Sequence, residues 1–189
     1  FLSVVKLDFP LSFSGITKDY DGNLYLFGLH SSESEIQLED TLLKWKHNFD
    51  LNFFIIKFGR KGNFKWLKSC GGTANEVIRS LVVDSSGNIY TTGWFSDTTD
   101  LNPAGGDMHV SHGRDDVFVQ KLDSLGNFIW GKTLGGTAAE FGQSLVVDGD
   151  ENLYIGGTFQ DSADMDPGPD KHFVPAITFE NNVEKVEAI

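Results

Sequence analysis

Residues 62–66 read Gly-Asn-Phe-Lys-Trp, and residues 126–130 read Gly-Asn-Phe-Ile-Trp, so the stretch that begins at 62 returns at 126, after 64 positions. A fixed interval of this kind indicates one supersecondary unit copied in tandem, and it decides the fold. It also bears on function, because a residue that recurs in each copy is needed to build the copy. Three further pairs of stretches share the interval: 71–76 with 135–140 (Gly-Gly-Thr-Ala-x-Glu), 80–84 with 144–148 (Ser-Leu-Val-Val-Asp), and 100–103 with 164–167.

Each unit contains two hairpin signals. Residues 79–93 place short apolar runs on both sides of Asp-Ser-Ser-Gly-Asn, and residues 117–130 place them around Asp-Ser-Leu-Gly-Asn. Asp, Ser, Gly and Asn favour tight turns, so each signal predicts a β-hairpin. Two hairpins give four antiparallel strands, and a four-stranded sheet repeated radially is a β-propeller blade. We therefore predict an all-β fold of tandem four-stranded antiparallel blades, with a helical turn or two expected only within residues 34–46.

The unit resembles the SBBP-type β-propeller repeat of bacterial secreted and surface proteins. Residues 117–159 carry the resemblance, in the order Phe-Val-Gln-Lys-Leu-Asp, Gly-Asn-Phe-Ile-Trp, Leu-Gly-Gly, Ser-Leu-Val-Val-Asp and Asn-Leu-Tyr-Ile-Gly-Gly. The hairpin at 83–90 is also similar to the NHL propeller repeat. The resemblance implies a propeller fold and a secreted or cell-surface location. It implies no reaction, because such repeats serve as scaffold and interaction surface.

The 189 residues form a single repeat array, with units predicted at about 13–76, 77–140 and 141–189 and a partial strand at 1–12. This amounts to about two and a half to three blades, whereas a closed ring usually needs about four to eight. Three explanations are open: the chain belongs to a longer protein, two copies complete one ring as a homodimer, or the terminal strands cap an open array. We favour the first.

The composition narrows the class of partner. The 40% hydrophobic and 22% charged content is typical of a folded protein, and the net charge of −12 repels nucleic acid. No apolar run approaches the roughly 18 residues of a membrane-spanning helix, so we predict no membrane insertion. No signal peptide is visible. The single cysteine, Cys70, is expected to be a small buried hydrophobic residue, since it stands at the repeat position of Leu134.

Two acidic loops are candidate calcium sites. Carboxylates at alternate positions of a turning loop can converge on Ca²⁺, which takes six to eight oxygen ligands. The alternative, which we favour, is turn formation, because Asp and Asn side chains bond their own backbone and Pro fixes φ. The candidate calcium ligands are Asp97, Asp100 and Asn102 in one loop and Asp161, Asp164, Asp166 and Asp170 in its copy.

Four further residues are candidate ligand-binding side chains. His109 and His112 lie among aspartates, a weak zinc-like pattern that also fits exposed loop residues. Trp45 and Trp94 do not recur at the repeat interval, and an exposed Trp offers a large flat surface to a sugar or a protein. Core or loop packing is the alternative for both. Trp66 and Trp130 do recur, and we expect them to pack between blades.

No motif of a catalytic or phosphate-binding site is present. Glu76 and Glu140 occupy equivalent repeat positions, which favours a shared structural role over a glycosidase pair. The leading hypothesis is a non-catalytic scaffold or binding module whose loops contact a protein or a glycan. The alternatives are a propeller-based hydrolase or lyase with a rim or channel site, and a purely structural repeat segment.

Overall fold

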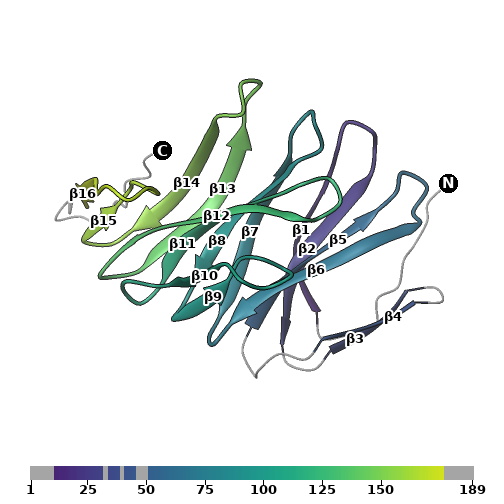
Figure 1. The fold of residues 1–189 in the computed structure, drawn as a ribbon, viewed down its shortest axis with the longest axis horizontal. Helices are drawn as coiled ribbons and strands as arrows, with labels where there is room; N and C mark the ends of the chain where they lie inside the picture. The colour runs from purple at the N-terminus through teal and green to yellow at the C-terminus, as the bar shows by residue number, and fades with distance from the viewer. Residues whose placement is uncertain (1–10, 32–33, 39–40, 46–50, 177–189) are drawn as a thin grey trace, which may run out of the picture.

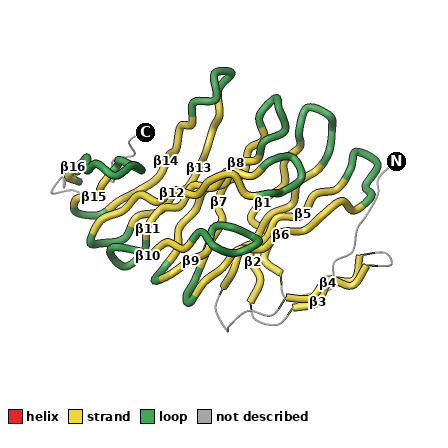
Figure 2. Tube along the Cα trace, viewed as in Figure 1, coloured by secondary structure: helices red, strands yellow, loops and turns green. Residues whose placement is uncertain are grey.

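The computed structural model describes residues 11–31, 34–38, 41–45 and 51–176, and the regular elements of these residues are all β-strands. Figures 1 and 2 show the strands as successive antiparallel sheets in which the β1–β2, β7–β8 and β13–β14 hairpins point to the same side. The predicted all-β fold of propeller blades is confirmed. None of the described residues form a helix that is long and apolar enough to cross a membrane.

The first two blades each contain four strands in chain order. Blade I consists of β1 (Leu11–Lys18), β2 (Leu24–Ser31), β5 (Leu51–Phe58) and β6 (Phe64–Gly72). Blade II consists of β7 (Glu76–Val83), β8 (Ile89–Phe95), β11 (Asp116–Leu122) and β12 (Phe128–Gly136). Of blade III, the described residues contain β13 (Glu140–Val147) and β14 (Leu153–Phe159), paired only with each other.

The repetition extends to strand register. The first hairpin of blade II slips by one residue between Ile78 and Ser80, and that of blade III slips between Gly142 and Ser144. The Asp-rich turns of these hairpins are also alike, since Asp84 and Asp148 each accept hydrogen bonds from the backbone and side chain of the Asn four residues later. The 64-residue interval therefore preserves bulges and turns as well as strand order.

Short hairpins tie the blades together. β9 (Thr98–Asp100) and β10 (Met108–Val110) leave blade II and continue the sheet of blade I, because Gly72 of β6 pairs with Thr99. β15 (Ser162–Asp164) and β16 (Phe173–Pro175) extend blade II in the same way, with Gly136 of β12 paired to Ala163. Glycine is required at the contact, since a Cβ at Gly72 would collide with the carbonyl of Thr98.

A third short hairpin lies between β2 and β5 in the chain, as β9–β10 lies between β8 and β11, but it forms a separate two-stranded sheet. β3 (Ser34–Leu38) and β4 (Thr41–Trp45) pair antiparallel, from Ser34 opposite Trp45 to Leu38 opposite Thr41. The expectation of a helical turn within residues 34–46 was therefore wrong. The physical reason is visible in Ser-Glu-Ile-Gln-Leu, whose apolar residues alternate with a period of two, as in a strand.

The core lies mainly between blades I and II. Phe53 of β5 stacks on Phe118 of β11 with ring centroids 5.0 Å apart and planes 8° apart. Cys70 belongs to this cluster and is 4% exposed, which confirms the expected small buried hydrophobic residue.

One side-chain row recurs in the blades and is called here the aromatic ladder. In blade I, Tyr25, Lys57 and Trp66 are cross-strand neighbours; the Lys57 ammonium lies 5.0 Å from the Tyr25 ring centroid, and Trp66 meets Tyr25 edge-on at 6.1 Å. Lys57 also donates a hydrogen bond to Ser124 O in blade II. Trp66 packs against the core cluster, so its expected place between blades is confirmed. Blade II repeats the ladder with Tyr90, Lys121 and Trp130.

Candidate functional site

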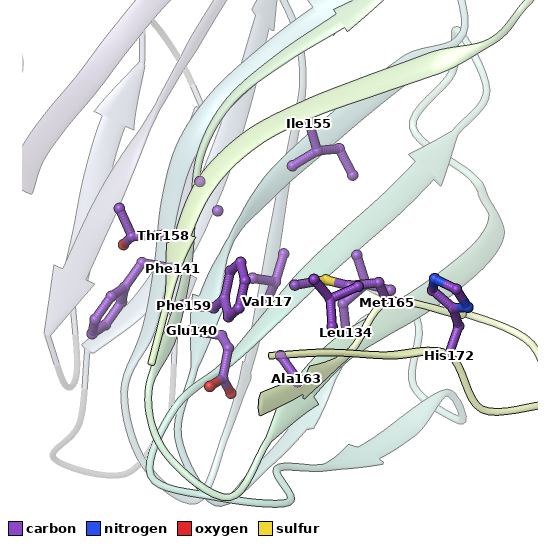
Figure 3. Close-up of a pocket in the computed structure, with 14 residues that line it drawn as sticks. Val117, Leu134, Glu140, Phe141, Ile155, Thr158, Phe159, Ala163, Met165 and His172 are labelled. Atoms are coloured by element: carbon purple, nitrogen blue, oxygen red, sulfur yellow. The ribbon is translucent and has the colours of Figure 1, made fainter. Parts of the chain in front are cut away.

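An apolar groove lies between blade II and the β13–β14 hairpin, with a volume of about 250 Å³. Figure 3 shows Val117, Leu134, Phe159 and Met165 gathered at its centre. Val117 and Leu134 are neighbours across β11 and β12, and Met165 follows β15, so the wall is built by the strands of blade II and its extension. Such a groove can bury apolar groups of a ligand or of a further strand.

Glu140 lies at one end of the groove, and His172 lies at its far side (Figure 3). Glu140 is 1% exposed and accepts a hydrogen bond of 2.8 Å from the Gly136 N–H. Burial, with the nearby charge of Asp116 in support, raises the pKa of Glu140 to about 7, against the opposing effect of the Gly136 N–H. A carboxyl that titrates near neutrality links the packing of blades II and III to pH.

Asp116 is a polar neighbour of Glu140. It distinguishes the contact between blades II and III from the contact between blades I and II. It is completely buried, and its Oδ2 lies 3.1 Å from His112 Nδ1 and accepts the His112 backbone N–H at 3.0 Å. The equivalent residue one repeat earlier, from 116 back to 52, is Asn52. The junction of blades II and III therefore holds a second carboxylate where the repeat has a neutral amide.

A second pocket, which is polar, lies beside the groove at the edge that carries β10 and β16, called the rim below. Its volume is about 480 Å³. The β9–β10 hairpin contributes His109, the chain before β11 contributes His112, and the loop between β15 and β16 contributes Lys171. The structure thus brings together both candidate histidines and part of one candidate acidic loop, namely Asp164, Asp166 and Asp170.

Both histidines are held by carboxylates. His109 Nε2 lies 2.9 Å from Asp107 Oδ2, within the β9–β10 hairpin. His112 is bound to Asp116 as described above, although its own side chain is 72% exposed. These contacts fix the two rings at the pocket wall. The two rings are suited to accept or donate hydrogen bonds to a bound molecule.

The carboxylates of the acidic loops are occupied by backbone N–H groups. Asp100 accepts from the amides of Asn102, Gly106 and Asp107 at 2.8–3.0 Å. Burial acts to raise the pKa of Asp100, but these hydrogen bonds outweigh it and hold the pKa below its usual value. In the copy, Asp164 accepts from Asp166 and His172, and this bonding lowers its pKa.

Two further candidate calcium ligands, Asn102 and Asp166, also serve the turns. Asn102 Oδ1 accepts the Ala104 N–H, and Asp166 Oδ1 accepts the Gly168 N–H. Asp97 and Asp161 occupy the same left-handed conformation, with φ of 57° in each. Within the described ranges, no three His, Cys, Asp or Glu side chains are grouped as a metal would require. These contacts agree with turn formation, and calcium binding by the two loops stays a prediction.

Of the two candidate tryptophans, the structure describes the side chain of Trp94, which is not among the residues that line the rim pocket. Trp94 of β8 is half-buried and meets Phe141 of β13 edge-on, with centroids 5.5 Å apart, so it packs blade II against blade III. Trp45 ends β4, and its side chain lies outside the described part of the structure.

Sequence reasoning missed the apolar groove and part of the rim. The groove depends on residues from six strands, β11 to β16, and no local pattern joins them. The signal for Asp116 was present, since it departs from the repeat at a position where the preceding copy has Asn52. Lys171 and Phe173 follow the acidic loop directly and could have been included with it.

No protein-family model matches the chain. Among curated proteins, the chain is similar to "Uncharacterized WD repeat-containing protein L264" of Acanthamoeba polyphaga mimivirus, with 26% identity over 113 residues. The match covers 58% of this chain and 8% of that protein. Together with the all-β architecture, this similarity supports a β-propeller repeat protein that acts as a scaffold or binding module.

Proposed function

We propose that the chain is a non-catalytic binding module that contacts a protein partner through the rim, defined here as β10, β16 and the polar pocket between them. This proposal rests on a difference between the polar residues that recur in each blade and those that do not. The recurring carboxylates accept hydrogen bonds from the backbone of their own turns, whereas His109 and His112 do not recur and line the rim pocket with the loop between β15 and β16.

The rim also exposes apolar side chains beside its polar ones. Met108 and Val110 on β10 are 59% and 61% exposed, and Phe173 on β16 is 54% exposed. The Lys171 ammonium lies 5.7 Å from the Phe173 ring centroid. Aromatic and methionine side chains within a polar surround are typical of protein interfaces. Within the described residues, β10 and β16 are also the last strands of their sheets, so each offers backbone groups to a partner strand.

The test compares two double variants by quantitative affinity capture. His112→Ala with Phe173→Ala removes exposed rim side chains, whereas Tyr20→Ala with Leu125→Ala removes exposed side chains at hairpin turns. We expect proteins captured by the unaltered chain to be lost from the rim variant and kept by the turn variant, with both variants folded by circular dichroism. Equal capture by both variants would refute the rim as the binding surface.

A glycan partner and a secreted or cell-surface location complete the proposal. They are supported by the resemblance of residues 117–159 to SBBP-type repeats, and the viral relative adds nothing on either point. A glycan array probed with the same two variants would test the first. A glycan signal that the rim variant abolishes supports it, whereas a signal that both variants retain counts against it. Localisation of the tagged natural protein would test the second.

A further inference from the structure

Blade III shows an incomplete aromatic ladder. Tyr25 and Tyr90 are 0% and 1% exposed, but the equivalent Tyr154 is 48% exposed. Its hydroxyl donates to Asp148 at 3.1 Å, as the hydroxyls of Tyr25 and Tyr90 donate to Asp19 and Asp84. The turn and the tyrosine are therefore in place. What blade III lacks within the described residues is a third strand with a lysine over the ring.

The free edge of β14 is the position of that strand. In blade II, β8 pairs with β11, and Lys121 lies opposite Tyr90 with Gln120 opposite Thr91. In blade III, β14 pairs only with β13 among the described residues. The apolar groove adjoins this edge, and Leu134, Met165 and Val117 stand at the repeat positions of Cys70, Leu101 and Phe53. In the preceding copy, Gln120 donates to Leu101 O and Cys70 Sγ, and Phe118 stacks on Phe53.

The groove is thus the space that a third strand occupies one repeat earlier. The sequence contains a segment of the matching pattern at the matching interval. Residues 119–123 read Val-Gln-Lys-Leu-Asp, and residues 183–187, again 64 positions later, read Val-Glu-Lys-Val-Glu. Val183 follows the end of β16 by eight positions, and Val119 follows the end of β10 by nine, so the connecting lengths agree to within one residue.

We propose that residues 183–186 of the chain bind the free edge of β14 as the third strand of blade III, with Lys185 opposite Tyr154 and Glu184 facing the groove. The Lys185 ammonium would cover the Tyr154 ring as Lys57 and Lys121 cover theirs at 5.0 and 4.8 Å. Such a cation lies against the negative face of the ring and is stabilised there. An added strand also satisfies the exposed backbone of an edge strand.

The segment departs from the pattern at two positions, and both have consequences. Glu184 replaces Gln120, so an ionised carboxylate cannot donate the hydrogen bond that Gln120 gives to a carbonyl. Asn182 replaces Phe118, so less apolar surface enters the groove. The segment therefore binds less tightly than β11 does in blade II.

Cysteine cross-linking in the full chain tests the register. Ile155→Cys with Glu184→Cys places thiols at the positions of Thr91 and Gln120, which are direct cross-strand neighbours. Ile155→Cys with Val183→Cys is the control for a shift of one residue. Ile155→Cys with Val5→Cys is the control for the N-terminal segment, where Val4-Val5-Lys6-Leu7 carries a similar pattern. The native Cys70 is buried and is common to all three variants.

We expect the 155–184 pair to form an intramolecular disulfide under mild oxidation, well ahead of both controls. Preference for the Val5 pair, an intermolecular disulfide that joins two copies, or equal yields in the three variants would each overturn the proposal. A second measurement leaves Ile155, which lines the groove, unchanged. Lys185→Ala should speed amide hydrogen exchange in β14 by about threefold to tenfold, the effect of losing one cation–π contact, and Lys6→Ala should leave it unchanged. Equal effects of these two substitutions would also overturn it. Neither result depends on whether the rim binds a partner.

Discussion

Asp84 shows how one residue type builds the repeat. It is buried, and its carboxylate accepts hydrogen bonds from the backbone amides of Ser86 and Asn88, the Asn88 side chain and the Tyr90 hydroxyl. Burial acts to raise the pKa of Asp84, but these donors outweigh it and leave the pKa below its ordinary value. The carboxylate therefore serves the turn, which explains why Asp recurs there.

Asp84→Ala should lower the free energy of unfolding by about 2–4 kcal/mol, because it leaves several donors without an acceptor at a charged hydrogen-bonding site. The matched control is Asp148→Ala, which removes the same contacts from the exposed hairpin of blade III and should cost less. Urea denaturation of the two variants measures the difference. A larger loss for Asp148→Ala would contradict this account of the turn.

Glu140 makes stability depend on pH. Its pKa is raised from 4.5 to about 7 in the folded protein, so the folded state holds this proton more tightly than the unfolded chain does. Its stabilising contribution is complete below pH 4.5 and is lost as the pH rises to about 7. Over that window we expect a loss of roughly 2–3 kcal/mol, observed as a fall in melting temperature.

Glu140→Gln should flatten the pH dependence between pH 4.5 and 7 and raise stability at pH 8, since the amide can still accept the Gly136 N–H. Asp116→Asn is the companion variant, because it removes the neighbouring charge and should lower the pKa of Glu140. His112, which contacts Asp116, is present in both variants. An unchanged pH profile in Glu140→Gln would show that Glu140 is not the responsible group.

Among the elements, the short hairpins that join blades depend on glycine. A Cβ at Gly72 would meet the Thr98 carbonyl, and the pairing of Gly72 with Thr99 holds β9 on blade I. Gly72→Ala should therefore lower the free energy of unfolding by about 1–3 kcal/mol through overpacking. Gly149→Ala is the control, because nothing lies within 4 Å of its Cβ position. Thermal melting of both variants makes the comparison, and equal melting temperatures would contradict the role of β9–β10 as a tie between blades.

The strands themselves were predictable from sequence, whereas the short hairpins were not. Stretches such as Val117–Leu122 combine β-branched and aromatic residues beside Asp-Ser-x-Gly-Asn turns, and these local signals determine both strand and turn. The β9–β10 hairpin has only three residues in each strand, and it pairs with a strand of the preceding blade. A contact of that kind leaves no alternation in the local sequence, so these short strands were not predicted.

The rim illustrates the same limit for function. His109 and His112 could be selected as departures from the repeat, but their shared pocket with Asp164 and Lys171 depends on how two successive blades stack. The stacking also gives Asp116 its buried position next to Glu140. Repetition thus separates building residues from candidate binding residues, and only the three-dimensional arrangement shows which candidates meet.

At the scale of the whole molecule, the chain is a row of blades in which recurring side chains build the sheets, and two departures from the repeat, His109 and His112, lie at the rim. Figure 1 shows the blades following one another from β1 to β14. The similarity to a WD repeat-containing protein, of which the match covers 8%, is consistent with blades as units that are added in tandem.

Amide hydrogen exchange on the full chain tests this account most directly. If the blades repeat as described, exchange is slow in β5 and β11, the third strands of blades I and II. The slow positions lie 64 residues apart, such as Ile55 and Val119. Fast exchange is expected of the exposed amides of Asp170 and Lys171, in the loop between β15 and β16. Slow exchange at these two residues, or protection that does not recur at the 64-residue interval, would contradict this account.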